Sequence, residues 1–138
     1  MENAGTAALA DAFWVDLYVN PRAAPTAPNE TWQLLAPNGA AWGVTVPLAV
    51  GEVLTLTLND AFYEVDQSDL DMPLSLGDEL WAQVDSANVG NADGAVSELD
   101  EGNNVGGPVA VTTDGPLSAS AVDAEAARST DAVSLPPR

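Results

Sequence analysis

Residues 13–19 read FWVDLYV, and this stretch decides the fold class. Its odd-numbered positions hold Phe, Val, Leu and Val, whereas its even-numbered positions hold Trp, Asp and Tyr. A repeat of two places alternate side chains on opposite faces, which is the pattern of a β-strand with one face toward a core. The stretch therefore predicts a strand rather than a helix.

Other short stretches along the chain repeat in the same way. Residues 53–59 (VLTLTLN) alternate leucine and threonine, and residues 80–84 (LWAQV) alternate small or apolar residues with larger ones. Further candidate strands are residues 42–48 (WGVTVPL), 95–99 and 109–113. Short strands separated by Gly, Pro, Asn and Asp are typical of an antiparallel sandwich or barrel. The predicted core consists of Phe13, Val15, Leu17, Leu54, Leu56, Leu58, Leu80, Ala82 and Val84.

The connections divide the chain into a domain and a tail. Residues 66–78 form a long acidic connection within the domain. From residue 114 onward the sequence is rich in Ala, Ser and Pro and has few large apolar residues, which is typical of a linker. We therefore expect one β domain over residues 1–113 and a tail or linker over residues 114–138.

The charge balance limits the partners. The 138 residues include 21 Asp and Glu against three bases, Arg22, Arg128 and Arg138, for a formal net charge of −18. Such a field repels nucleic acid and anionic membranes and concentrates cations. Solvation in high salt gives the same bias. No apolar run approaches the ~18 residues of a membrane span, so we expect neither nucleic-acid binding nor membrane insertion.

Catalysis has few groups to draw on. The sequence contains no His, Cys or Lys, and so lacks the usual general bases and activated nucleophiles. A carboxylate pair can cleave glycosides, but no segment marks an acid in an apolar pocket. We expect that the protein is not an enzyme.

Several motifs in order resemble the CARDB family, the cell-adhesion-related domain found in bacteria. They are an N-x-G near the start (Asn3 to Gly5), the strand VDLYV, the turn PLAVGE at residues 47–52, and the close ELDEGNN at residues 98–104. The resemblance covers about residues 2–108. It implies an immunoglobulin-like antiparallel β-sandwich of about seven strands, used as a module of cell-surface proteins.

One departure from that family is at the N-terminus. Members usually carry another strand before the N-x-G turn, whereas here Met1 comes almost directly before it. We therefore expect a sandwich that lacks its N-terminal strand, either because the start is truncated or because another segment completes it. The tail offers a candidate donor strand in the alternating residues Leu117, Ala119 and Ala121.

An acidic stretch, VDSANVGNADGAVSELDEGNN at residues 84–104, suggests a metal site. It does not fit an EF-hand loop, because the first position of that loop falls on Val89. Calcium still needs only six to eight oxygens, which loops between strands can supply. The candidate ligands for Ca²⁺ are Asp85, Asp93, Glu98, Asp100, Glu101 and Asn103. The alternative is a hairpin whose Asn and Asp side chains cap backbone groups.

Aromatic residues on the polar faces of two strands suggest a binding surface. Trp14 and Tyr18 occupy even positions of the first strand, and Trp81 occupies the polar side of another. If exposed, these rings can stack on sugars or anchor a partner. The alternative is that a loop or the chain's own termini cover them.

Two functions follow as expectations. The first is a non-catalytic structural or adhesion module of a cell-surface or extracellular assembly, joined to other copies or to neighbouring modules by strand exchange that can build a filament. The second is a module that binds carbohydrate or protein ligands through the aromatic residues. The extracellular location rests on the family resemblance, since MENAGTAALADAF has no signal-peptide pattern.

Overall fold

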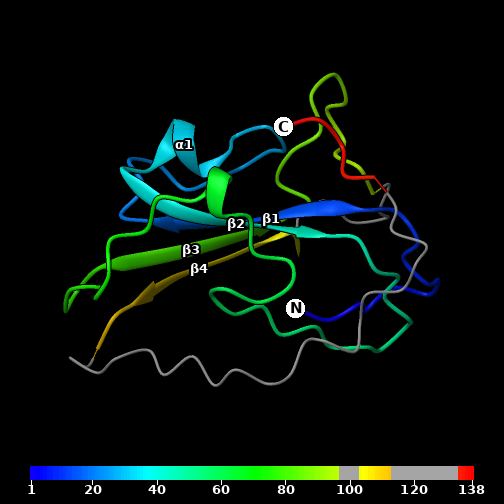
Figure 1. Cartoon of the computed structure of the whole chain (residues 1–138), viewed down its shortest axis with the longest axis horizontal. Coiled ribbons are helices and arrows are strands. Elements are labelled where there is room, and N and C mark those ends of the chain that lie inside the picture. The colour runs from blue at the N-terminus through cyan, green and yellow to red at the C-terminus, as the bar shows by residue number, and fades with distance from the viewer. Residues whose placement is uncertain (97–102, 113–133) are drawn as a thin grey trace.

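The computed structural model of the chain describes residues 1–96, 103–112 and 134–138. These residues form mainly β-structure with little helix (Figure 1). The elements in order are β1 (Phe13–Val19), α1 (Trp32–Leu35), β2 (Asn38–Val44), a 3-10 helix η1 (Val65–Gln67), β3 (Glu79–Val84) and β4 (Val105–Ala110). The expected all-β class fits this arrangement.

The four strands form one antiparallel sheet in the order β2-β1-β3-β4. β1 lies in the interior of the sheet, so its backbone is paired on both sides. Val15 is opposite Trp42 on β2 and opposite Val84 on β3. The whole predicted stretch 13–19 is strand, which confirms the first expectation at its stated bounds.

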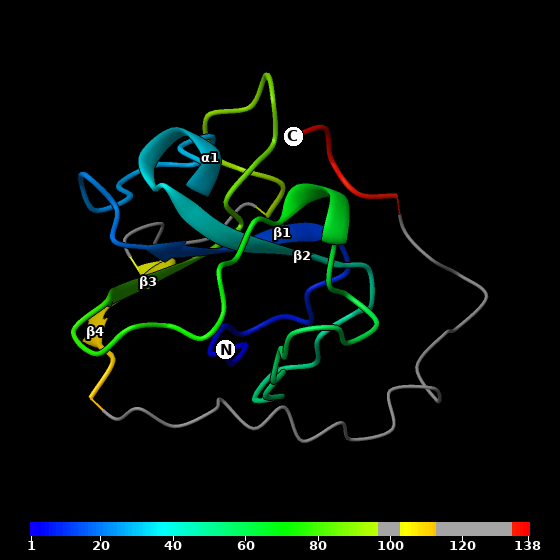
Figure 2. The same ribbon diagram turned by 60° about the vertical axis from the view of Figure 1, so that its left-hand side comes forward.

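Side chains on one face of the sheet, which we call the lower face, form an apolar core. Its buried members are Phe13, Val15, Ala40, Trp42 and Val44, joined by Val96 from a loop. Below them runs an irregular layer made of the N-terminal residues and the segment after β2 (Figures 1 and 2). Partly buried residues of this layer, including Leu9, Leu54, Leu56, Leu58 and Phe62, pack against the core.

That layer is held by isolated pairings rather than by a regular sheet. Glu2 bridges Val53, and Leu9 bridges Leu48. The amino group of Met1 donates to the Leu54 carbonyl at 3.0 Å, and Leu54 N–H donates back to the Met1 carbonyl at 2.9 Å. The first residues of the sequence therefore pair with the segment predicted as the strand 53–59, which is not assigned as a regular strand.

The opposite face of the sheet, which we call the upper face, is also covered. It carries Trp14, Asp16 and Tyr18 from β1, and β1 is buried on both faces as a result. The helix α1 lies above it, and residues 134–138 lie on the same side, whereas the N-terminus lies on the other (Figures 1 and 2). Trp32, Ala87 and Leu135 pack against its aromatic side chains.

Other strand bounds differ from the expected ones. β2 begins at Asn38 instead of residue 42, and β4 begins at Val105 instead of residue 109. Ala82, predicted in the core, is exposed, and Leu80 is only half-buried; neither is among the residues that pack in the lower-face core. The four described strands also fall short of the expected seven.

Candidate functional site

The candidate site is built around Asp16, in the middle of β1. The alternation of the strand directs this side chain to the upper face, where it is 0% exposed. Its Oδ2 accepts a hydrogen bond from Trp32 N–H at 2.8 Å, and its Oδ1 accepts one from the Ser86 hydroxyl at 2.8 Å. A carboxylate without solvent costs several kcal/mol unless a cation and further donors compensate it.

Arg138 supplies the cation. Its Nη1 lies 2.6 Å from Asp16 Oδ1, and its Nη2 donates to Asp16 Oδ2 at 2.7 Å. The guanidinium also stacks on Trp14, with Cζ 4.8 Å from the ring centroid, and Nη2 lies 3.2 Å from Gln33 Oε1. Nη2 makes the hydrogen bond to the carboxylate, whereas the Nη1 contact is an ion pair only, since Nη1 and Nε are buried without a hydrogen-bond partner among the described residues. The Arg138 side chain is only 8% exposed.

The residues before Arg138 follow the same surface. Pro136 and Pro137 have no backbone N–H, and both of their carbonyls are used as acceptors. Trp14 Nε1–H donates to the Pro136 carbonyl at 2.9 Å, and Val89 N–H donates to the Pro137 carbonyl at 3.0 Å. We call residues 134–138 the C-terminal segment.

Leu135 is the apolar residue that anchors this segment, and its side chain lies over β2. A Cβ atom at Gly43 would overlap Cδ1 of Leu135, so the absence of a side chain at Gly43 leaves the space that the leucine fills. The three atoms nearest to that Cβ all belong to Leu135. The C-terminal segment therefore lies against Trp14, Asp16 and Gly43, and we call the surface formed by these three residues the groove.

Tyr18 continues the buried polar row beside Asp16. Its hydroxyl lies 2.8 Å from Gln83 Oε1 and 2.9 Å from the Glu30 carbonyl, within hydrogen-bonding distance of both. Burial and the nearby Asp16 carboxylate raise the pKa of Tyr18 far above its ordinary value of 10.0, and Arg138 opposes this effect. The phenol therefore stays neutral and serves as a donor.

The predicted aromatic surface is covered. Trp14 is 7% exposed and Tyr18 is 0% exposed, so of the two alternatives the exposed binding surface does not describe either ring. The alternative that the chain's own terminus and loops cover them describes what is seen. Trp81 is half-buried, and its Nε1–H donates to Glu79 Oε1 at 2.7 Å. The three rings do not form one exposed strip.

The predicted calcium ligands are not gathered in the described part of the chain. Asp85 is buried, and its carboxylate accepts the N–H groups of Ala95 at 2.9 Å and Val96 at 2.8 Å, as the capping alternative expects. Asp93 and Asn103 are exposed. Glu98, Asp100 and Glu101 lie outside the described residues. Among the described residues, no three Asp or Glu side chains come together as metal ligands.

The predicted donor strand also lies outside the described residues, since these exclude Leu117, Ala119 and Ala121. Its insertion into a groove beside the first sheet therefore stays a prediction. The part of the tail that is described, residues 134–138, lies on the upper face of the sheet, away from the N-terminal residues (Figure 1).

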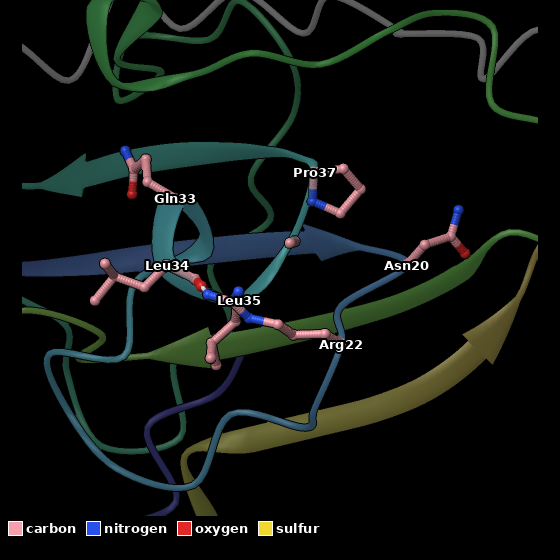
Figure 3. A pocket seen from close by; sticks show the side chains of 7 residues that line it. Asn20, Arg22, Gln33, Leu34, Leu35 and Pro37 are labelled. Atoms are coloured by element: carbon pink, nitrogen blue, oxygen red, sulfur yellow. Dashed lines mark hydrogen bonds between the residues drawn. The ribbon is translucent and has the colours of Figure 1, made fainter.

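A shallow hollow of about 260 Å³ lies beside the groove, between α1 and the residues that follow β1 (Figure 3). Arg22 crosses it and donates to the Leu34 carbonyl. The Asn20 side chain is bonded instead to Asp78 and to Glu79 N–H. The residues that line the hollow are Asn20, Arg22, Gln33, Leu34, Leu35, Ala36 and Pro37. The hollow has no acid–base pair among these residues, so the groove is the stronger candidate.

Sequence reasoning placed Asp16 only on a polar strand face and missed Arg138 as its partner. A signal was present, because a carboxylate between large apolar residues of a strand needs a cation if it is buried. Only three bases exist in the sequence to supply one. Which of the three pairs with Asp16 depends on contacts 122 residues apart, which no local pattern encodes.

Comparisons with family models, with curated proteins and with solved structures found no match. Within the described residues, no helix has the length and apolar character needed to cross a membrane.

Proposed function

We propose that this protein is a non-catalytic structural module of a cell-surface or extracellular assembly, and that subunits are joined by exchange of a terminal segment. The observation that carries the proposal is the C-terminal segment on the upper face. It reaches β1 across 122 residues of sequence through a buried ion pair and a hydrogen bond to Trp14.

The chain length allows this exchange. Residues 111–133 separate the C-terminal segment from the end of β4, and a chain of that length reaches at most about 80 Å. A domain of this size has a radius of gyration of only about 13 Å. The same groove therefore accepts a segment from its own chain or from a neighbour. Exchange from one copy to the next is heterologous and can grow into a filament.

The use of the polar groups supports binding rather than catalysis. Both Asp16 oxygens accept hydrogen bonds from Trp32 and Ser86 in addition to the arginine. A general acid or base needs a lone pair or proton directed at a substrate, and these contacts direct both oxygens at the protein itself. The resemblance to CARDB modules supports the surface location and the immunoglobulin-like sandwich, in which the irregular lower layer takes the place of a second sheet.

Size-exclusion chromatography with light scattering over a wide range of protein concentration tests the proposal. We expect multimers that increase with concentration, and a loss of these multimers in a variant with Leu135→Ala and Arg138→Ala. Gly106→Ala is the matched control, because a Cβ atom there meets nothing within 4 Å. A full chain that stays monomeric at every concentration would overturn the proposal.

A further inference from the structure

We infer that the upper-face groove is a peptide-binding site that selects arginine. Its ligand is an extended Leu-Pro-Pro-Arg segment supplied by a second copy of this chain. The inference rests on the proposed function, because it names the surface and the segment that one copy presents to the next. The C-terminal segment seated in the groove shows the contacts that such a ligand makes.

The first step is the choice of arginine. Asp16 presents both oxygens to the two terminal nitrogens of Arg138, at 2.6 and 2.7 Å, and Trp14 offers its ring face at 4.8 Å. A planar guanidinium lies over the indole ring while its Nη2 bonds to both Asp16 and Gln33. A lysine ammonium is a compact, strongly hydrated charge that lacks the planar surface for this stack. The groove therefore discriminates between the two cations.

The second step is the pair of prolines. They are recognised through their carbonyls, by the indole N–H of Trp14 and the backbone N–H of Val89. Proline-rich segments favour an extended conformation before they bind, so less conformational entropy is lost on docking. The donors of the groove match a segment that offers acceptors and lacks N–H groups at these positions.

The third step is the place for Leu135, which exists only because residue 43 is glycine. A Cβ atom at Gly43 would overlap the leucine, and its three nearest atoms all belong to Leu135. Gly43 is therefore a position where a single change meets the ligand first. Valine suits a strand, so Gly43→Val is the variant of choice.

Electrostatics favours a cationic ligand over the chain as a whole. The net charge is −18, and Arg138 is one of three bases. That field attracts any cationic peptide, so binding by charge alone has to be separated from binding by the groove. In about 1 M salt the Debye length falls to about 3 Å, which screens surface attraction far more than a buried pair.

The experiment uses the full chain with Leu135→Ala and Arg138→Ala, which removes the leucine and the arginine that compete for the groove. The probes are two fluorescent peptides carrying residues 128–138 as C-terminal amides, one with the native arginine at 138 and one with lysine there. Fluorescence anisotropy in about 1 M salt measures their affinities. We expect the arginine peptide to bind at least about tenfold more tightly, because the lysine peptide loses the stack on Trp14 and the ion-pair contact of the second terminal nitrogen with Asp16.

Host variants locate the site. Adding Gly43→Val should abolish binding of the arginine peptide, whereas the matched Gly106→Val, on β4 with open space around it, should leave binding unchanged. Equal affinity for the two peptides, or equal binding by the Gly43 and Gly106 variants, would overturn the inference. Because these comparisons use no change at Asp16, they do not depend on whether an Asp16 variant folds.

The outcomes separate this inference from the proposed function. Peptide binding by the groove in a protein that never forms multimers refutes the assembly role and the second copy as the source of the ligand, and retains only the recognition of the Leu-Pro-Pro-Arg segment. Multimers that persist in Gly43→Val place the subunit contact elsewhere, and refute the groove as the link while the module still assembles.

Discussion

The two faces of one sheet are stabilised in different ways. The lower face is stabilised by apolar packing of side chains such as Phe13, Val15 and Val44, which does not need directional bonds. The upper face depends on directed contacts, with Asp16 joined to Trp32, Ser86 and Arg138. The same seven residues of β1 serve both faces. The comparison teaches that a strand with one polar face need not be half-exposed, since distant segments can cover that face too.

The two faces also differ in what covers them. Segments near the strands in sequence, such as residues 46–62, seal the lower face. A short segment near residue 138 seals part of the upper face, and it contributes one aliphatic anchor, two carbonyls and one guanidinium. We therefore expect the lower-face core to contribute most of the free energy of unfolding. We expect the C-terminal segment to leave the upper face without unfolding of the sheet.

The largest expected effect is on the lower face. Phe13 is 1% exposed, so Phe13→Ala should lower the free energy of unfolding by about 3–5 kcal/mol, through lost burial and the cavity it leaves. Urea denaturation followed by circular dichroism measures the change. Val109→Ala, at a residue 63% exposed on β4, is the control and should change stability by less than about 0.5 kcal/mol. Similar losses in both variants would mean that Phe13 does not lie in the core.

The sequence was a good guide to the lower face. The alternation in β1 predicted its bounds and its apolar side, and Leu54, Leu56 and Leu58 do pack toward the core. Residues 53–59 nevertheless form isolated pairings instead of a regular strand. Alternation reports which side chains are buried, whereas a ladder also needs a paired backbone, which the alternation of one segment does not reveal.

The sequence was a poor guide wherever small residues form strands. The first half of β2 is Asn-Gly-Ala-Ala, with weak strand preference, yet Gly39 is required because a Cβ there would overlap the Leu17 carbonyl oxygen and lie 2.6 Å from Trp32 Cγ. Close approach of a backbone carbonyl and a ring, not local propensity, selects glycine at this position. The groove was missed for a related reason, because Gly43 has meaning only beside Leu135.

The second prediction tests whether the upper face opens separately. Asp16→Ala should cost about 3 kcal/mol, because Trp32 N–H and the Ser86 hydroxyl lose their acceptor while buried. Arg138→Ala should cost less, about 1–2 kcal/mol, because the C-terminal segment can leave and admit water to Asp16. Urea denaturation of both variants checks the order.

The indole N–H groups report each face in the same samples. Trp14 Nε1–H is bonded to the Pro136 carbonyl on the upper face, and Trp42 Nε1–H is bonded to the Thr57 carbonyl on the lower face. In Arg138→Ala, hydrogen exchange of Trp14 should become faster while that of Trp42 is unchanged. Equal acceleration of the two signals would show that the faces open together and that the comparison fails.

The third prediction adds the acidic loop beyond β3 as a third region. The sequence predicts an extracellular-type calcium site with a Kd of about 10⁻⁴–10⁻³ M. Calcium at ten times Kd should then stabilise the fold by about 1.4 kcal/mol. Thermal melts in calcium, magnesium and EDTA measure this, and Asp100→Asn with Glu101→Gln should abolish the difference. Identical melts in the three solutions would exclude the calcium site and leave the loop only the capping of backbone N–H groups seen for Asp85.

The smallest effect concerns the loop over Tyr18. The Glu30 carboxylate accepts hydrogen bonds from Thr26 N–H at 2.7 Å, from the Thr26 hydroxyl at 3.0 Å and from Ala27 N–H at 3.1 Å. These bonds, with that of the Thr26 N–H the largest cause, lower the pKa of Glu30 below its ordinary value of 4.5. The Glu30 carbonyl in turn lies 2.9 Å from the Tyr18 hydroxyl, so the loop belongs to the cover of the upper face.

Because the folded state prefers the ionised form, Glu30 stabilises the protein above its ordinary pKa, and this contribution is lost as the pH falls through the lowered value. Glu30 is partly exposed, so solvent screening limits the effect to about 0.5 kcal/mol or less. Glu30→Gln should therefore be slightly less stable than the native chain at neutral pH and converge with it in acid. Urea denaturation across this pH range measures the difference.

The control is Asp78→Asn, at a residue outside the upper-face cover. The pKa of Asp78 is also lowered, and the largest cause is a hydrogen bond from the Asn20 side chain. If only Glu30→Gln speeds exchange of the Trp14 indole, the loop and the C-terminal segment act as one cover; exchange unchanged in both variants would confine Glu30 to its own turn.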